Sequence, residues 1–233
     1  MLVCFWSPKG GSGTSVTAAA AALVLAREGP ARVADLDGDL PAVLGLADDP
    51  EQGLRDWLRT GPEAPTDALD RLAVDAGREL SLLPAGVGDL GAASAEAGAA
   101  LGVALQSDSR STVVDVGVVA PGRAPALHAL VEVADASVIV VRGCYLALRR
   151  AVRLELTARA TGAVFVDEAG RALGAHDVAN VLGVPVLATV SVRESTARAV
   201  DAGVLPTRLP DALARPAREV LRRIGALDRE QAA

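Results

Sequence analysis

The nine residues Ser7-Pro8-Lys9-Gly10-Gly11-Ser12-Gly13-Thr14-Ser15 decide the fold of this chain. They follow the apolar run Leu2–Trp6 and precede an alanine-rich stretch over residues 16–26, an order that predicts a buried strand, a glycine-rich loop and a helix. In such a unit the loop N–H groups and the positive end of the helix dipole converge on one spot, which suits a phosphate. Glycines are needed because a Cβ would block the ligand and some positions require a positive φ.

The same loop contains the only lysine of the sequence. Of the 23 lysine and arginine residues, Lys9 alone is lysine, so the chain uses arginine everywhere except in this loop. A compact ammonium group fits a glycine cradle that a planar guanidinium does not. We therefore predict that Lys9 is a phosphate ligand; the alternative is one lysine that survived by chance at an exposed turn.

The loop resembles the deviant Walker A motif, xKGGxGK[ST], of the MinD/ParA family of P-loop ATPases. The resemblance implies that Lys9 is the signature lysine, a catalytic residue that reaches across a nucleotide-sandwich dimer to the partner's phosphates, and that Ser15 supplies the hydroxyl that binds magnesium. It also implies that ATP or ADP is held by the loop residues Lys9, Gly10, Gly11, Ser12, Gly13, Thr14 and Ser15. Thr14 departs from the motif because it stands where the family has its second lysine.

Acidic residues end two further apolar segments. The segment 32–37 is predicted to be a strand in which Asp35 and Asp37 point to the same side, because side chains alternate along a strand. They match an Asp-x-Asp motif of the family, in which the later Asp positions the attacking water or reaches magnesium through water. This match gives Asp37 a catalytic and metal-binding role; the alternative is a solvated Asp-Gly-Asp turn.

The segment Thr112-Val113-Val114-Asp115 has the pattern of a Walker B strand. A buried strand holds such a carboxylate rigidly toward a magnesium shell, which makes Asp115 a candidate metal ligand. Gly117 and Gly122 suit a switch loop that shifts when a phosphate is present. His128 and His176 lack carboxylate or cysteine neighbours at ligand spacing, so we interpret them as surface or packing residues.

Strand and helix patterns alternate along the rest of the chain. This alternation, with nearly continuous apolar strands, predicts a three-layer α/β fold with a mostly parallel sheet and helices on both faces. Residues 1–225 are expected to form one domain, followed by a short tail over 226–233. Residues 48–78 are interpreted as a surface excursion with helical fragments such as 54–58, and Trp57 as a core cap, with a partner contact as the alternative. The expected strands are 79–84, 136–141, 162–166 and 184–190, and the expected helices are 92–106, 146–160, 176–182, 194–202 and 211–224.

Composition narrows the function classes. Aromatic residues make up 2% of the chain and the net charge is −6, so nothing indicates a base-stacking or broadly basic surface for nucleic acid. The sequence shows no signal peptide and no apolar stretch that could span a bilayer. Cys4 and Cys144 are interpreted as small buried hydrophobic residues in a reducing cytoplasm.

Later segments extend the resemblance to about residues 1–225. The segments 134–141, 182–189 and 198–203 are similar to strands and a late helix of the family, closest to its TadZ/CpaE and septum-site-determining-like branch. The receiver-like N-terminal domain common in that branch has no counterpart in this sequence. Asp167-Glu168 stands where many relatives have an adenine-contacting Asn-Arg pair, which makes Asp167 a candidate nucleotide contact.

Three functions compete at this point. The first is a MinD/ParA-like localisation or assembly factor, serving a Tad-type pilus, a secretion apparatus or septum placement, with protein partners and a homodimer implied. The second is a metabolic ATP-dependent enzyme of the same superfamily, for which no acid- or amide-binding site is visible. The third is a Rossmann oxidoreductase, because Gly11-x-Gly13 followed by Asp35 imitates a dinucleotide fingerprint, although the third glycine is missing.

Thr14 bears directly on catalysis. A charge-assisted hydrogen bond to a phosphate contributes roughly 1.5–3 kcal/mol, about ten- to a hundredfold in affinity. Thr14 offers a hydroxyl without that charge, so we expect hydrolysis to be weak or lost.

The last helix carries arginines beside an apolar stripe and is expected to pack on the domain, although peripheral membrane contact is an alternative. The arginines of residues 146–160 are interpreted as a solvated face.

Overall fold

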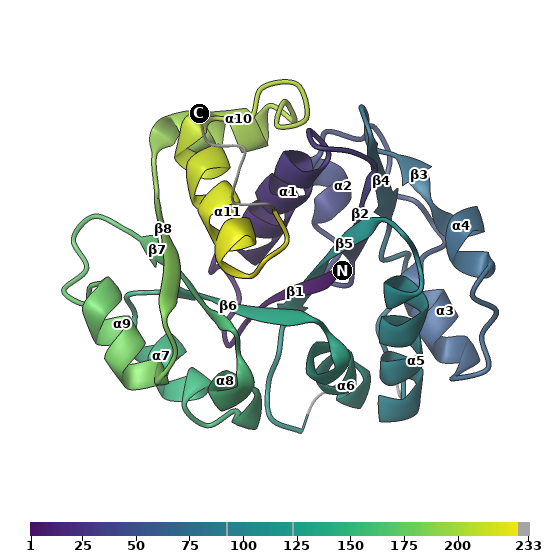
Figure 1. Ribbon diagram of the computed structural model, residues 1–233, viewed down its shortest axis with the longest axis horizontal. Helices are drawn as coiled ribbons and strands as arrows, with labels where there is room; N and C mark the ends of the chain where they lie inside the picture. Colours follow the sequence, from purple (N-terminus) through teal and green to yellow (C-terminus); the bar gives the residue numbers. More distant parts are fainter. Residues whose placement is uncertain (92, 123, 228–233) are drawn as a thin grey trace.

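The computed structural model describes residues 1–91, 93–122 and 124–227, and it has one eight-stranded sheet at its centre (Figure 1). The strand order is β3-β4-β2-β5-β1-β6-β7-β8. Neighbouring strands are parallel except for β3, which pairs antiparallel with β4 at one edge. The strands are β1 (Leu2–Ser7), β2 (Ala31–Asp35), β3 (Val74–Asp75), β4 (Leu80–Leu83), β5 (Ser111–Val118), β6 (Ala136–Arg142), β7 (Gly162–Asp167) and β8 (Val186–Ser191).

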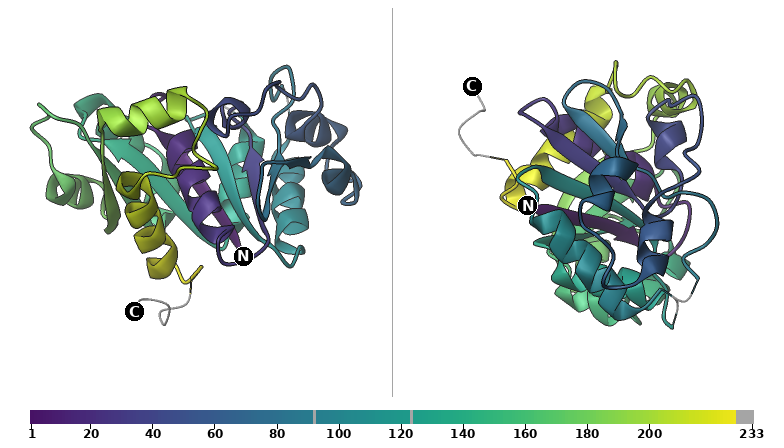
Figure 2. Two further views of the ribbon diagram at one scale, coloured as in Figure 1. Left: turned by 90° about the horizontal axis from the view of Figure 1, so that it is seen from above. Right: turned by 90° about the vertical axis from the view of Figure 1, so that its right-hand side faces the viewer.

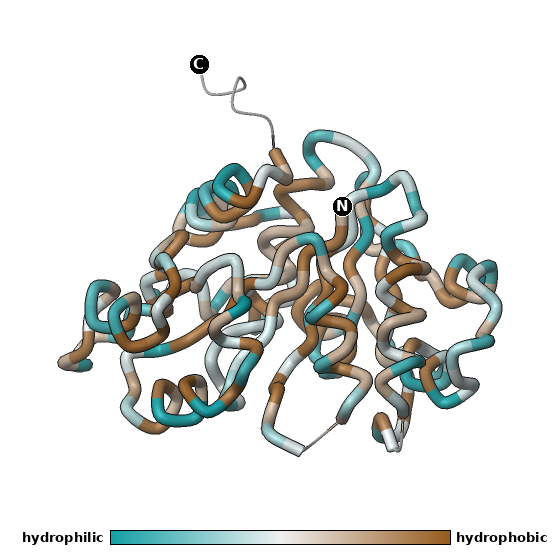
Figure 3. Tube along the Cα trace, turned by 60° about the horizontal axis from the view of Figure 1, so that its bottom comes forward, coloured by the Kyte–Doolittle hydropathy of each residue, from teal (hydrophilic) through white to brown (hydrophobic). Residues whose placement is uncertain are grey.

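Helices cover both faces of the sheet, which confirms the predicted three-layer α/β architecture (Figures 1 and 2). One face packs against α1 (Thr14–Leu25), α2 (Leu40–Val43), α10 (Glu194–Asp201) and α11 (Asp211–Arg223). The other face packs against α3 (Leu54–Thr60), α4 (Ala68–Leu72), α5 (Ala95–Gln106), α6 (Pro125–Val133), α7 (Tyr145–Ala151), α8 (Glu155–Arg159) and α9 (Ala175–Leu182). Hydrophobic residues run along the central strands and hydrophilic ones gather on the outer helices and loops (Figure 3).

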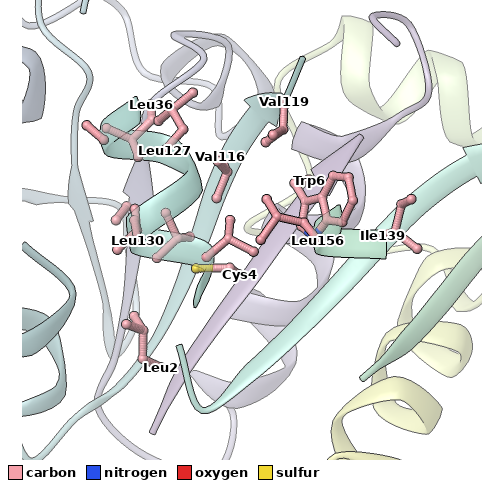
Figure 4. Packing of buried hydrophobic residues seen from close by; sticks show 14 of the residues in the cluster. Leu2, Cys4, Trp6, Leu36, Val116, Val119, Leu127, Leu130, Ile139 and Leu156 are labelled. Carbon is pink, nitrogen blue, oxygen red and sulfur yellow. The ribbon is translucent and has the colours of Figure 1, made fainter. Parts of the chain in front are cut away.

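Strand β1 lies near the middle of the sheet and is buried along its whole length. Its side chains alternate between the two layers, as a strand requires. Leu2, Cys4 and Trp6 face α6 and α8, and Figure 4 shows them beside side chains from those helices. Val3 and Phe5 face α1 on the opposite side. The Trp6 indole Nε1 donates a hydrogen bond to Ser137 Oγ at 2.9 Å, so the polar atom of this buried ring is satisfied.

Helix α1 is almost entirely enclosed, since only Val16 of its twelve residues is not buried. Its alanines allow the neighbouring helix α11 and the sheet to approach closely. The apolar side of α11, which includes Leu213, Val220 and Leu221, is buried against this layer, as the sequence predicts. Among the described residues, no helix combines the length and the apolar composition needed to cross a membrane.

Several local predictions need correction. Residues 48–78 contain the predicted helical fragment, as α3, but they are not only a surface excursion: they also form α4 and β3, and they bury Leu54, Leu58 and Leu69 in the core. Trp57 is 4% exposed and its Nε1 donates to the carbonyl oxygen of Pro65 at 2.9 Å, which confirms its core role. The Pro, Gly and Asp residues of this segment form its turns, and the apolar side chains between the turns pack into the core.

The predicted helix over 146–160 is wrong as a single element. It is divided into α7 and α8, because the chain turns at Val152–Leu154 to bury the Leu154 side chain. The interpretation of Cys144 as buried is also wrong, whereas Cys4 is buried as predicted. Cys144 is half-buried just before α7, where hydrogen bonds from the backbone N–H groups of that helix lower the pKa of its thiol.

A buried arginine joins the sheet to the outer loops. Arg32 in β2 is 2% exposed, and its Nη2 lies 2.7 Å from Asp70 Oδ1 and 3.0 Å from Asp108 Oδ2. Arg110 donates to both carboxylates as well. The hydrogen bonds from Arg110, with the charge of Arg32, lower the pKa of Asp108 to about 2. This network stabilises the folded protein while Asp108 is ionised.

We expect Asp108→Asn to lower the free energy of unfolding by about 1–2 kcal/mol at pH 7. Because the pKa of Asp108 is lower in the folded than in the unfolded chain, this contribution is present above about pH 4 and disappears as the pH falls toward 2. Urea unfolding at pH 7 and pH 3 measures it. The control is Asp67→Asn, which breaks an exposed pair with Arg71 and should cost less than about 0.5 kcal/mol. Equal losses for both variants at pH 7 would contradict the assignment.

Candidate functional site

The glycine-rich loop connects the carboxyl end of β1 to the first turn of α1, as predicted. Gly11 and Gly13 have φ angles of 73° and 88°, a conformation that residues with a Cβ rarely adopt. The hydroxyl groups of Ser7 and Ser12 both donate to the Lys9 carbonyl oxygen, at 3.0 and 2.7 Å. The loop is therefore shaped by its own hydrogen bonds and leaves its inner side open.

That inner side faces a cavity of about 480 Å³. Ligand pockets typically enclose roughly 300–1,000 Å³. The wall combines the loop and the first turn of α1 with acidic residues from the turn before α2 and from α10, and with one arginine from β6. The lining residues are Ser7, Gly10, Gly11, Ser12, Gly13, Thr14, Ser15, Val16, Asp37, Asp39, Ala42, Val43, Val118, Arg142, Val200 and Asp201.

Two buried carboxylates lie beside each other on adjacent strands, Asp35 at the end of β2 and Asp115 within β5, which continues to Val118. Asp35 in β2 is in register with Asp115 in β5, and both residues are 0% exposed. The Asp35 carboxylate accepts hydrogen bonds from the backbone N–H groups of Asp37, Gly38 and Leu40, at 3.0, 2.7 and 3.0 Å. The strand predicted over 32–37 therefore ends at Asp35, because the chain folds over this carboxylate.

Asp115 is less well satisfied. Its Oδ1 accepts from the Gly117 N–H at 3.1 Å, whereas its Oδ2 is buried without a hydrogen-bond partner in the described part of the chain. Burial raises the pKa of Asp115 to about 7, Ser15 opposes the rise, and the neighbouring charges of Asp35 and Asp37 add to it. Burial likewise raises the pKa of Asp35 to about 6, against the backbone hydrogen bonds. A buried carboxylate close to a serine hydroxyl, with one of its oxygens left without a partner in the described residues, offers the oxygen ligands that a hard cation prefers.

Asp37 reaches the site from the turn after β2 rather than from the strand. Its side chain lies against Gly117: a Cβ at position 117 would be 2.3 Å from Asp37 Oδ1, and Gly117 has a φ of 70°. Arg55 of α3 fixes the turn, because its Nη2 donates to the carbonyl oxygen of Asp37 at 2.8 Å. Burial raises the pKa of Asp37, the charge of Asp39 adds to this and Arg55 opposes it.

Two segments that line the cavity, α2 and α10, are followed by glycines that contact each other. A Cβ at Gly45, just after α2, would lie 2.0 Å from the carbonyl oxygen of Gly203, just after α10. Both glycines have positive φ angles, of 73° and 62°. The main chains of two segments far apart in the sequence therefore meet directly beside the cavity wall.

The structure brings together most of the predicted site residues. The loop from Gly10 to Ser15 and Asp37 line one cavity, and the buried Asp115 faces Ser15. Lys9 does not line it: its Nζ donates to the carbonyl oxygen of Gly10 at 3.3 Å on the exposed side of the loop. Asp167 is exposed at the end of β7 and does not line the cavity either. Their predicted roles remain predictions.

Sequence reasoning missed three polar residues of the cavity wall, namely Asp39, Arg142 and Asp201. Arg142 is the last residue of β6, the strand next to β1. Because ligands bind beyond the carboxyl ends of parallel strands, this position could have identified Arg142 as a candidate. In the described residues no group of three or more histidine, cysteine, aspartate or glutamate side chains is arranged to hold a metal ion alone. A larger groove of about 860 Å³ lies between α9, β8 and α11, but it contains neither the loop nor the buried carboxylates.

This arrangement is the P-loop NTPase fold. The glycine-rich loop follows β1, and β5, which carries Asp115, lies between β1 and β2. In the common Rossmann order β1 and β2 are adjacent, so the third function considered from the sequence loses its structural basis.

Solved structures share this fold. A ParA family ATPase from Chlorobium tepidum superposes with a TM-score of 0.75 at 20% identity, covering 93% of this chain and 95% of that one. The septum site-determining protein MinD from Pyrococcus horikoshii, complexed with Mg-ADP, gives 0.75 at 18% identity, covering 96% and 95%. A complex of a Cyanothece McdA variant with ATP gives 0.72 at 18% identity, covering 99% and 98%. No family model and no curated protein matches the sequence.

We expect Asp115→Asn to stabilise the ligand-free protein at pH 8, raising Tm by at least about 2 °C, because it removes a buried charge. The pKa of Asp115 is higher in the folded than in the unfolded chain, so ionisation destabilises the fold as the pH rises from about 4 to 7. The variant should flatten this part of the stability profile in thermal melts. Asp201→Asn, at an exposed residue of the same cavity, is the control and should leave Tm unchanged. A lower Tm for Asp115→Asn at pH 8 would refute the argument.

Proposed function

We propose that this protein binds ATP or ADP with Mg²⁺ in the cavity beneath the loop and acts as a MinD/ParA-like localisation or assembly factor. The observation that carries the proposal is the juxtaposition of the open loop with the buried, unpartnered oxygen of Asp115 among the described residues. The shared fold supports it, because two of the similar structures were solved with Mg-ADP and with ATP. The specific system, a Tad-type pilus, a secretion apparatus or septum placement, follows from the resemblance of the sequence.

The residues present fit the nucleotide and the metal. The loop from Gly10 to Ser15 would surround the phosphates with backbone N–H groups at the start of α1, where the helix dipole favours anions. Ser15 and Asp115 would hold Mg²⁺ on the side of β5, with Asp37 able to reach its water shell. Magnesium supplies charge neutralisation to the phosphate oxygens when it is bound.

Hydrolysis is expected to be slow or absent. Thr14 is buried at the position of the family's second lysine and brings no charge to the phosphates. The protein would then use nucleotide chiefly to change its assembly state. The position of Lys9 agrees with this, because its ammonium group is outside its own cavity, where a second copy of the chain could meet it. We propose a homodimer with two nucleotides at the interface.

Isothermal titration of the purified protein with MgATP, MgADP and NADH tests the binding step. We expect MgATP and MgADP to bind, EDTA to weaken both, and NADH to give no heat. Ser15→Ala should weaken the magnesium-dependent part of the affinity by about tenfold, because it removes an oxygen ligand. Binding of NADH alone would reject the proposal.

Sizing by light scattering tests the assembly step. We expect the mass to double with MgATP and to stay monomeric with MgADP. Lys9→Ala should abolish the doubling and change the MgATP dissociation constant of the monomer by less than about threefold, since Lys9 does not line the monomer cavity. A large loss of monomer affinity would show instead that Lys9 binds the phosphates of its own subunit. Steady turnover comparable to that of intact P-loop ATPases would contradict the slow-hydrolysis expectation.

A further inference from the structure

We infer that Arg142 supplies the positive charge that the loop lacks at Thr14 and binds the terminal phosphates of a polyphosphate ligand in the cavity. Arg142 is the only cationic side chain among the described residues that line the cavity. It shares that wall with Thr14 and Ser15. This inference rests on the proposed function, and it assigns a binding role to a residue outside the loop motif.

The alternation of β6 places Arg142 on the correct side of the sheet. Val138 and Val140 belong to the core cluster on the α1 face, and Ile139 and Val141 belong to the opposite one. Because side chains alternate along a strand, Arg142 projects toward the α1 face of the sheet, where the glycine-rich loop leads into α1. Strand β6 pairs with β1 directly, so the end of β6 lies next to the loop.

The guanidinium group is only loosely engaged in the protein. Its Nη1 lies 3.7 Å from Glu168 Oε2, whereas Arg171 Nε binds the same oxygen at 2.9 Å. Arg142 Nε is buried without a hydrogen-bond partner among the described residues. The Arg142 side chain is 34% exposed and its ion pair with Glu168 is long, so its Nη groups can turn to an anion in the cavity without breaking a strong contact.

The cavity wall carries several acidic side chains, so a polyphosphate can bind there only if a cation lies close to it. Asp37, Asp39 and Asp201 line the wall, and Asp35 and Asp115 lie buried beside it. Such a site repels a polyphosphate unless positive charge lies close to it. Magnesium at Ser15 and Asp115 would neutralise one side of the ligand, and Arg142 reaches the cavity from the side of β6. A guanidinium fork can bind two phosphate oxygens at once, which a threonine hydroxyl cannot.

The test compares wild type, Arg142→Gln, Thr14→Lys and the double variant by calorimetry with MgATP and with inorganic tripolyphosphate. Gln keeps much of the length and the hydrogen-bonding capacity of the side chain and removes its charge. We expect Arg142→Gln to weaken both ligands about ten- to a hundredfold. We expect Thr14→Lys in the Arg142→Gln background to restore at least about tenfold. Arg159→Gln, which removes an exposed arginine paired with Glu132 outside the cavity wall, is the matched control and should bind like wild type.

Each outcome separates the two ideas. Unchanged binding by a folded Arg142→Gln variant, with a wild-type circular dichroism spectrum and Tm, would overturn the role of Arg142 and leave nucleotide binding intact. Failure of the lysine to rescue would also overturn it. If wild type binds tripolyphosphate through Arg142 and does not bind MgATP, the inference stands and the proposed nucleotide function fails. If wild type binds neither ligand, both fail.

Discussion

The site depends on keeping negative charge inside a parallel sheet. Asp35 and Asp115 lie on adjacent strands, in register and out of contact with water, and burial raises the pKa of each carboxyl group. Three backbone N–H groups satisfy Asp35, and they do so by ending β2 and turning the chain across the sheet edge. That turn delivers Asp37 to the cavity. The hydrogen bonds that satisfy one buried carboxylate therefore shape the turn that carries another acid of the cavity wall.

The two buried acids differ in how completely their oxygens are hydrogen-bonded. Asp35 has a full set of donors and serves the backbone, whereas Asp115 keeps one oxygen without a partner in the described part of the chain. Buried polar atoms in native proteins are nearly always satisfied, so the unpartnered Asp115 oxygen is an exception within this site. Figure 1 shows why these groups meet: β1, β2 and β5 run side by side in the sheet, and α1 packs over them.

The sequence predicted the loop and most of the strands and longer helices, because glycine spacing and apolar runs are local signals. It also assigned Ser15 and Asp115 to one magnesium site, from the family resemblance and the apolar run before Asp115. It did not predict the end of β2 at Asp35, because the hydrogen bonds that end the strand depend on a carboxylate whose burial only the fold determines. The predicted strand over 136–141 ended one residue before Arg142, and the pairing of β6 with β1, which makes this residue part of the cavity wall, is set by the fold.

Gly45 and Gly203 fix the spacing between two segments that line the cavity, α2 and α10. Their main chains are in contact, so the spacing of the chain just after α2 and just after α10 is set at this point by atoms that have no rotamers to change. Side-chain rearrangement alone therefore cannot separate these two segments, which can move apart only as whole segments. Because α10 is joined through a loop to α11, which lies on α1, such a movement would be transmitted to the last helix of the chain.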